Sequence, residues 1–315
     1  MDVGKKTAAI IGAGLIGRAW SVVFARAGWR VRLYDAVPGQ LDTARQLIAQ
    51  ALSEQQRVGL VADAGAALAL ISTCTTLAET VIDAAWVQEN LPEDIELKRS
   101  VFAELDQLAT SDAVLASSTS AIVASHFTAH LAGRARCLVA HPVNPPHLVP
   151  VVELCGAPWT TEETLQRAWT TMESVGQVPV LVRREIEGFV LNRLQGALLS
   201  EAMRLVADGV VSPEDLDKTV RDGLGLRWSF MGPFETIELN APGGVPDYCA
   251  RYSGFYRRLA ADAAPASVWQ GSSAERVTAA LGAPLTAAQR DRRTERRDRR
   301  LLALRRHKLD IEAHD

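Results

Sequence analysis

The first 185 residues alternate between short apolar runs and amphipathic stretches with a helical repeat. Residues 8–11 and 114–117 are apolar runs of strand length, and a strand that is covered on both faces shows no polar side. Between such runs, as in residues 41–52, apolar positions recur at helical spacing. The alternation predicts an α/β fold with a doubly wound, mostly parallel sheet and helices on both of its faces.

The first apolar run leads into a glycine-rich turn and then into a helix. Gly12, Gly14 and Gly17 form a Gly-x-Gly-x-x-Gly pattern directly after the predicted strand. The first glycine permits a tight turn, the second lets the backbone approach a pyrophosphate, and the third lets the helix pack close to the strand. Free N–H groups at the start of the helix, at Leu15 and Ile16, then face the phosphate oxygens. The pattern predicts a Rossmann-type dinucleotide site.

An acidic residue follows the second predicted strand, residues 30–34. Asp35 lies 18 residues after Gly17, about where the hydroxyls of an adenine ribose need an acceptor. Its neighbour is Ala36, and no arginine stands beside it to hold a 2′-phosphate. The sequence therefore predicts NAD, rather than NADP, as the cofactor. A glycine-rich turn without a ligand is the structural alternative.

The pattern changes near residue 187 and is helical almost to the end of the chain. Residues 212–215 (Ser-Pro-Glu-Asp) are a strong helix start, with a serine cap, proline at the first position and two acids in the first turn. We therefore predict two domains. Residues 1–187 form an NAD-binding, Rossmann-like domain, and residues 188–315 form an all-helical C-terminal domain for the substrate.

Oxidation of an alcohol needs a hydride acceptor, a base for the hydroxyl proton and donors that hold the developing carbonyl. His141 is the leading base, because it lies at the carboxyl end of a predicted strand, beside a proline-rich loop. Ligands bind at this edge of open α/β sheets. Glu153 lies twelve residues on, in a strand that can return beside the histidine and fix its tautomer.

Two further polar residues complete this candidate site. Ser120 follows another strand end, and Asn192 is a polar position on an otherwise apolar helix face. Each candidate has a structural alternative, namely a capping serine, a core histidine with a partner, or an asparagine near a helix cap. Their positions at matching strand ends around an NAD fold favour the catalytic interpretation.

Composition and charge narrow the class of protein. The chain has 315 residues, 48% hydrophobic and 23% charged, and its net charge of −3 implies no pull toward nucleic acid or membrane. Its four cysteines form no C-x-x-C pair and no metal pattern with the histidines, so we expect buried thiols and no metal site. The first strand begins almost at the first residue, and no apolar run approaches the roughly 18 residues of a membrane span. We expect a cytoplasmic protein.

A basic stretch occupies residues 290–308, where ten Lys and Arg stand against three acidic residues. A nucleic-acid-binding arm is one interpretation. We favour a solvated C-terminal helix, in which the acids pair with arginines three or four positions away and Leu301, Leu302 and Leu304 pack inward. The acids are interleaved, and no aromatic residue is available to stack on bases. We therefore expect no nucleic-acid partner.

Six segments resemble the 3-hydroxyacyl-CoA dehydrogenase superfamily, and within it the L-gulonate 3-dehydrogenase (lambda-crystallin) branch. They are residues 11–20, 92–98, 117–120 (Ser-Ser-Thr-Ser), 139–146 (Val-Ala-His-Pro-Val-Asn-Pro-Pro), 188–195 and 223–235. The segments span nearly the whole chain and come in the superfamily's order. The resemblance implies an NAD-dependent dehydrogenase that acts on a CH–OH group and forms a homodimer through its helical C-terminal domain.

The resemblance also implies roles for single residues. The superfamily's catalytic His and Glu correspond to His141 and Glu153, and its substrate-oxygen Ser and Asn correspond to Ser120 and Asn192. Lysine and asparagine residues near the cofactor are matched as well. The cofactor-binding residues that we assign are Gly12, Gly14, Leu15, Ile16, Gly17, Asp35, Glu89, Lys98, Ser117 and Asn144.

Substrate size separates the branches of this superfamily. Members that act on acyl-CoA carry aromatic residues after the catalytic histidine, where this chain has Pro142-Val143, and they lack the Leu-Arg-Trp of residues 226–228. We hypothesise that Arg227 binds the carboxylate of a free 3-hydroxy acid, and an ion pair with a protein carboxylate is the alternative. L-gulonate, giving 3-dehydro-L-gulonate, is the first substrate expected. The alternatives are a short-chain L-3-hydroxyacyl-CoA, L-carnitine, and a non-catalytic, crystallin-like role with NAD bound.

Overall fold

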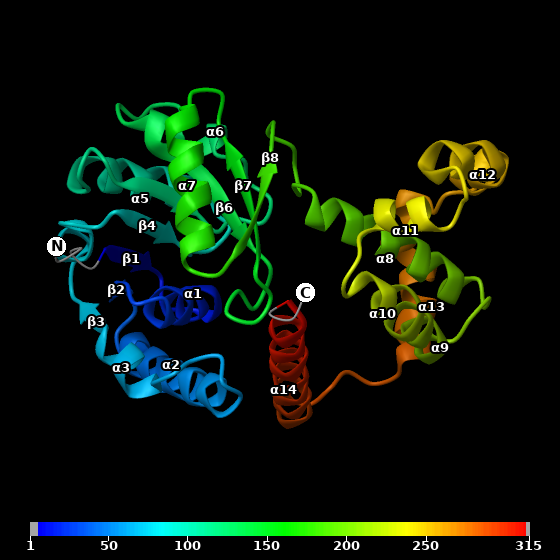
Figure 1. Cartoon of the computed structure of the whole chain (residues 1–315), viewed down its shortest axis with the longest axis horizontal. Coiled ribbons are helices and arrows are strands. Elements are labelled where there is room, and N and C mark those ends of the chain that lie inside the picture. The colour runs from blue at the N-terminus through cyan, green and yellow to red at the C-terminus, as the bar shows by residue number, and fades with distance from the viewer. Residues whose placement is uncertain (1–5, 313–315) are drawn as a thin grey trace. The chain divides into compact units, whose positions relative to one another are not determined.

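The computed structural model describes residues 6–312, and its contacts divide the chain into two compact units (Figure 1). The first unit runs to Val190 and takes in the stretch from Ala287 onward, and the second unit is Leu191–Thr286. The sequence predicts domains 1–187 and 188–315, which places the last helix in the second domain. By its contacts this helix belongs to the first unit.

One eight-stranded sheet forms the centre of the first unit. Its strands are β1 (Thr7–Ile11), β2 (Arg30–Tyr34), β3 (Ile71–Cys74), β4 (Trp86–Glu89), β5 (Val114–Ser117), β6 (Cys137–Pro142), β7 (Val151–Gly156) and β8 (Val178–Val182). The strand order is β3-β2-β1-β4-β5-β6-β7-β8. The pairs from β3 to β6 are parallel, β7 runs antiparallel to β6, and β8 is parallel to β7. The predicted α/β class with a mostly parallel sheet is confirmed.

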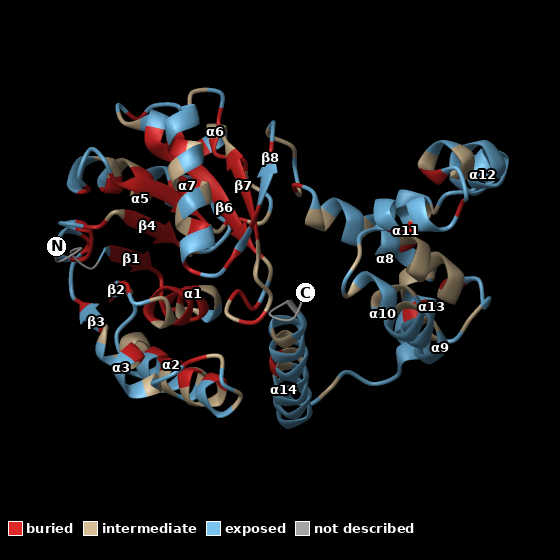
Figure 2. Ribbon diagram, viewed as in Figure 1, coloured by how far each residue is buried: buried red, intermediate tan, exposed pale blue. Residues whose placement is uncertain are grey.

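Helices cover the two faces of this sheet. They are α1 (Leu15–Arg26), α2 (Gln40–Arg57), α3 (Ala64–Ala69), α4 (Leu77–Val81), α5 (Ile95–Leu108), α6 (Ser125–Thr128) and α7 (Glu162–Ser174), with a 3-10 turn at Arg134–Arg136. The last helix of this unit, α14 (Ala287–Glu312), comes from the far end of the chain. Trp20, Phe24 and Trp86 lie in the core on one face, and Phe102 and Phe127 lie in the core on the other. The central strands β1, β4, β5, β6 and β7 are the most deeply buried, whereas β3 and β8 at the two edges are partly exposed (Figure 2).

Helix α14 contains the basic stretch of the sequence. Arg305 donates to the carbonyl oxygens of His147 at 3.0 Å and Gly176 at 3.1 Å, and Arg306 donates to the carbonyl of Gly59 at 3.1 Å. Of the leucines predicted to pack inward, Leu302 is 4% exposed, whereas Leu304 is 43% exposed. No sequence pattern predicts contacts to backbone carbonyls. They link α14 to the first unit.

The second unit is helical throughout. It contains α8 (Leu191–Ala207), α9 (Pro213–Lys218), a π-helical turn (Thr219–Leu224), α10 (Gly225–Trp228), α11 (Pro233–Leu239), α12 (Gly244–Ala261), a 3-10 turn (Ala266–Trp269) and α13 (Gly271–Leu281). The predicted helix start at Ser212 is present, because its side chain accepts a hydrogen bond from the backbone N–H of Asp215. Most of these helices are exposed (Figure 2). No helix among the described residues is long and apolar enough to cross a membrane.

Candidate active site

The glycine turn joins β1 to α1 in a tightly packed conformation. Gly12 has a φ of +92°, which disfavours any residue with a side chain. A Cβ atom at Gly17 would lie 1.8 Å from the carbonyl oxygen of Gly12, so only glycine allows this close approach of helix and turn. A Cβ atom at Gly14 would instead meet no atom within 4 Å, so space is open above the middle of the turn.

The first turn of α1 is available to an anion. Gly14 caps the helix without a side-chain hydrogen bond, and the first turn contains no acidic residue. The backbone N–H groups there have no partner within the helix, and they lie at the positive end of its dipole. Open space, unpaired donors and positive potential together fit the pyrophosphate of a dinucleotide.

A pocket of about 750 Å³ opens beside this turn. It is lined by Gly12, Gly14, Tyr34, Asp35, Asn90, Leu91 and neighbouring residues, none of which is Lys or Arg. The Asp35 carboxylate accepts hydrogen bonds from the backbone N–H of Ala13 at 2.7 Å and of Val37 at 2.8 Å. Because the pocket lies where β1 is flanked by β2 and β4, it occupies the switch point of the sheet, where nucleotides bind.

His141 and Glu153 face one another on neighbouring strands. They are directly opposite in the antiparallel register of β6 and β7, and His141 Nδ1 lies 2.8 Å from Glu153 Oε2. Both are buried, with 5% and 2% of their surface exposed. The strand expected to return beside the histidine therefore does so. A proton on Nδ1 that is donated to the carboxylate leaves a lone pair on Nε2, which is the state of a general base.

The chain that follows β8 completes the surroundings of this pair. Glu153 Oε1 accepts a hydrogen bond from the backbone N–H of Val190 at 2.8 Å. The ring of Phe189 lies 5.5 Å from the imidazole, is fully buried, and has a φ of +47°, which is unusual for a residue with a large side chain. A non-glycine residue held in this conformation suggests that the site, rather than local preference, fixes its position.

Ser120 lies in the loop after β5 and is held by a carboxylate that sequence reasoning missed. Both its backbone N–H and its hydroxyl donate to Glu93 Oε1, the hydroxyl at 2.8 Å, and the hydroxyl of Thr119 donates to the same oxygen at 3.1 Å. Glu93 belongs to the segment 92–98, where an acid before a helix has an ordinary explanation as a partner of the helix dipole. Only the folded chain brings it to Ser120.

Three of the residues assigned to the cofactor form one buried network at the ends of β4 and β5. Lys98 Nζ lies 3.0 Å from both carboxylate oxygens of Glu89, and the Ser117 hydroxyl donates to Glu89 Oε2 at 2.5 Å. Lys98 and Glu89 are 1% and 0% exposed. Lys98 Nζ also lies 3.8 Å from Glu93, which connects this network to Ser120.

Both parts of the chain match models of one known enzyme family. Residues 7–186 match the NAD-binding domain of 3-hydroxyacyl-CoA dehydrogenase, and residues 188–276 match its C-terminal domain. The chain belongs to the 3-hydroxyacyl-CoA dehydrogenase family. It is therefore an NAD-binding protein of a family of CH–OH oxidoreductases.

Two characterised relatives and one solved structure are similar to this chain over most of its length. The chain is 44% identical to lambda-crystallin of Oryctolagus cuniculus, over 86% of each chain. It is 40% identical to L-carnitine dehydrogenase of Oceanobacillus iheyensis, over 74% of this chain and 76% of that protein. Among solved structures, an NAD⁺-dependent dismutase, 5-formyl-3-hydroxy-2-methylpyridine 4-carboxylic acid 5-dehydrogenase, has a TM-score of 0.83 and 30% identity, with 96% of this chain and 98% of that one covered.

The remaining predicted residues are distributed over both units. Asn144 is exposed in the loop that follows β6. In the second unit, Asn192 is the second residue of α8, and Arg227 is exposed on α10. Arg227 has no Asp or Glu within 4 Å anywhere in residues 6–312. In the same range, no group of three or more His, Cys, Asp or Glu could hold a metal ion.

Proposed function

We propose that this protein catalyses the NAD-dependent oxidation of the 3-hydroxyl group of a small, free L-3-hydroxy acid. L-gulonate, which gives 3-dehydro-L-gulonate, is the first substrate that we propose. The buried His141–Glu153 pair, at the carboxyl end of β6 in an NAD-binding sheet, is the observation that carries the proposal. A purely structural protein has no need for a buried ionisable pair of this geometry.

The proposed mechanism assigns one task to each side chain. His141 Nε2 accepts the proton of the substrate's C3 hydroxyl group, while Nδ1 donates to Glu153. The Glu153 carboxylate orients the ring and stabilises the imidazolium that forms. Ser120 and Asn192 hold the substrate oxygen. The NAD, when bound, accepts the hydride from C3.

Two observations support a free acid over a coenzyme A ester. Arg227 has no acidic partner among the described residues, which leaves its planar guanidinium available for a substrate carboxylate. One relative is named for L-carnitine, which is itself a free 3-hydroxy acid. The family's own name is that of an acyl-CoA enzyme, so a short-chain L-3-hydroxyacyl-CoA is the second candidate.

Arg227→Ala tests the role of this arginine. We expect the KM for the free acid to rise more than about tenfold, because a bidentate carboxylate contact is lost, while kcat changes little. Arg221→Ala removes the same charge from an exposed Arg221–Asp222 pair and is the matched control. An unchanged KM in Arg227→Ala would remove the proposed anchor.

Formation of NADH by the purified protein tests the proposed reaction. The substrates are L-gulonate, DL-3-hydroxybutyrate, L-carnitine and 3-hydroxybutyryl-CoA, each with wild-type protein and with His141→Ala. We expect turnover of free acids that is lost in the variant. NAD binding without turnover of any substrate would instead favour the non-catalytic, crystallin-like role.

We also propose a homodimer in the cytoplasm, without a nucleic-acid partner. Large apolar side chains are exposed across the second unit, and such patches mark protein contacts. All four cysteines are free, and three of them are buried, which suits a reducing compartment. In α14, Arg306 pairs with Asp310, four residues on, at 2.7 Å, and Arg297 pairs with its neighbour Asp298 at 2.8 Å, so part of the basic charge is compensated within the helix.

A further inference from the structure

An apolar cavity lies beside the second half of α14, and none of the residues assigned to NAD or to catalysis lines it. Its volume is about 320 Å³, which is at the lower end of the range of small-molecule sites. Seven of its ten lining residues are apolar, namely Leu148, Val149, Pro150, Val178, Leu301, Leu304 and Leu309. All ten belong to the first unit, so the cavity is formed within one compact part of the chain.

The walls of this cavity leave apolar surface in contact with water. Val178, Leu304 and Leu309 are 51%, 43% and 46% exposed. A single exposed apolar residue is ordinary, but these three come from β8 and α14 and line one hollow. Burial of such surface is favourable by roughly 25 cal/mol per Å², so the walls fit the hydrophobic part of a ligand.

Two cations at the cavity have no acidic partner. Arg305 donates to two backbone carbonyls, but it has no Asp or Glu within 4 Å in residues 6–312, and burial lowers the pKa of its guanidinium. In the same range, the exposed side chain of Lys308 makes no hydrogen bond or ion pair. The nearby carboxylate of Asp310 pairs with Arg306 at 2.7 Å, and none of the ten lining residues is acidic. The cavity therefore combines apolar walls with uncompensated positive charge.

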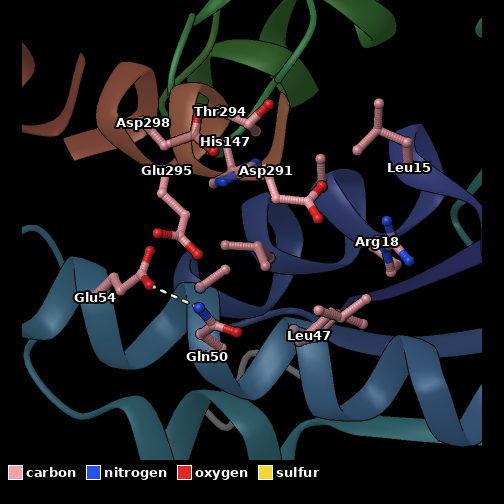
Figure 3. A pocket seen from close by; sticks show the side chains of 14 residues that line it. Leu15, Arg18, Leu47, Gln50, Glu54, His147, Asp291, Thr294, Glu295 and Asp298 are labelled. Atoms are coloured by element: carbon pink, nitrogen blue, oxygen red, sulfur yellow. Dashed lines mark hydrogen bonds between the residues drawn. The ribbon is translucent and has the colours of Figure 1, made fainter. Parts of the chain in front are cut away.

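A second pocket of about 320 Å³, beside the first half of α14, has the opposite charge. Four carboxylates line it against one arginine, and Figure 3 shows them on α2 and α14: Glu54, Asp291, Glu295 and Asp298. The charges of α14 are thus divided by position, with acids at the second pocket and Arg305 and Lys308 at the apolar cavity. An anion is disfavoured at the second pocket and favoured at the apolar cavity.

We propose that the apolar cavity binds an amphiphilic carboxylate of the medium-chain fatty acid class. The alkyl chain lies between the leucines of α14 and the wall formed by residues 148–150, and Lys308 binds the carboxylate, with Arg305 adding positive potential. The cavity shares no residue with the proposed active site. This inference can therefore fail while the oxidation of a 3-hydroxy acid stands, and the reverse also holds.

Calorimetry with the full-length protein tests the site without any turnover. The probes are octanoate, octan-1-ol and octylamine, which share the chain length and differ in charge, and hexanoate, which is two methylene groups shorter. Lys308→Gln removes the cation, and Leu304→Glu places a negative charge in the wall at a partly exposed position. Arg299→Gln is the control, because Arg299 is exposed on α14 and lines neither pocket. Thermal unfolding checks that each variant is folded.

We expect octanoate to bind more tightly than octan-1-ol, octylamine to bind most weakly, and hexanoate to bind about tenfold more weakly than octanoate. Lys308→Gln should raise the Kd of octanoate about fivefold or more and leave that of octan-1-ol unchanged, Leu304→Glu should abolish octanoate binding, and Arg299→Gln should change neither. Absence of octanoate binding to the wild type would overturn the proposal, and would be expected if another protein surface covers the cavity. A Kd that is unchanged in both Lys308→Gln and Leu304→Glu would overturn it too, because octanoate would then bind elsewhere.

Discussion

The buried pair of His141 and Glu153 decides whether this chain can move a proton. Glu153→Gln keeps the shape of the side chain but removes the charge that orients the imidazole and stabilises its protonated form. We expect kcat to fall about 100-fold or more, with the Kd of NAD unchanged, because general base catalysis is worth that much. Steady-state kinetics and an NAD titration measure the two quantities.

Glu163→Gln is the matched control for this substitution, because Glu163 is exposed in the first turn of α7, away from the site. It should retain the wild-type kcat. A kcat of Glu153→Gln within twofold of the wild type would contradict the assignment of the base.

Glu93 makes the Ser120 loop sensitive to pH. Burial raises the pKa of its carboxyl, but hydrogen bonds from Ser120 and Thr119 and the charge of Lys98 outweigh burial, so the pKa lies below its usual value. A pKa that is lower in the folded than in the unfolded state stabilises the fold above the unfolded value, about 4.3. This stabilisation is lost as the pH falls through the folded-state pKa.

The difference in free energy of unfolding between wild-type protein and Glu93→Gln should therefore shrink as the pH falls from about 6 to about 3. Urea unfolding at a series of pH values measures it. A difference that is constant across this range would show that the charged form of Glu93 has no special role in the folded protein.

At the scale of elements, we expect two glycines of the turn between β1 and α1 to have different roles: Gly17 is needed for packing and Gly14 for NAD binding. Gly17→Ala places a Cβ against the Gly12 carbonyl, so we expect a marked loss of thermal stability. Gly14→Ala enters open space, so stability should be retained while NAD binding weakens, because the methyl group occupies the approach of the pyrophosphate. Thermal unfolding and an NAD titration distinguish the two variants. Equal stability of both would contradict this division of roles.

The sheet and its switch point were predictable because local patterns encode them. Apolar runs gave the strands, the spacing of Gly12, Gly14 and Gly17 gave the turn, and Asp35 lay at the expected distance. The contact of His141 with Glu153 was predictable in outline, because a returning strand is the shortest route between them. The role of Glu93 was not, because its partner Ser120 is 27 residues away and no periodicity links the two.

At the scale of the whole molecule, the position of α14 was likewise not predictable from local sequence patterns. The composition of residues 290–308 indicates a helix with an apolar side, and Leu302 is buried as expected. Its arginines, however, bind backbone carbonyls at Gly59, His147 and Gly176, which carry no sequence signal. The domain boundary predicted from the change in pattern near residue 187 therefore leaves out a helix that returns from the far end of the chain.

The second unit carries the proposed dimer contact. Its most exposed large apolar residues, each between 65% and 76% exposed, are Leu194, Val210, Leu226, Phe230, Phe234, Leu239 and Leu281. We expect the protein to sediment with twice its chain mass and Phe230→Asp/Phe234→Asp to sediment as a monomer, because charges cannot be buried in such a contact. Ile82→Asp, at an equally exposed position in the first unit, is the control. A wild-type monomer at every concentration would contradict the proposal.

The most direct test of the proposed function is the kcat/KM for NADH formation from L-gulonate, measured beside that from 3-hydroxybutyryl-CoA. We expect the free acid to have the higher value, and His141→Ala to abolish turnover of both. A higher kcat/KM for the coenzyme A ester would place the protein with the acyl-CoA enzymes and leave Arg227 without its proposed role.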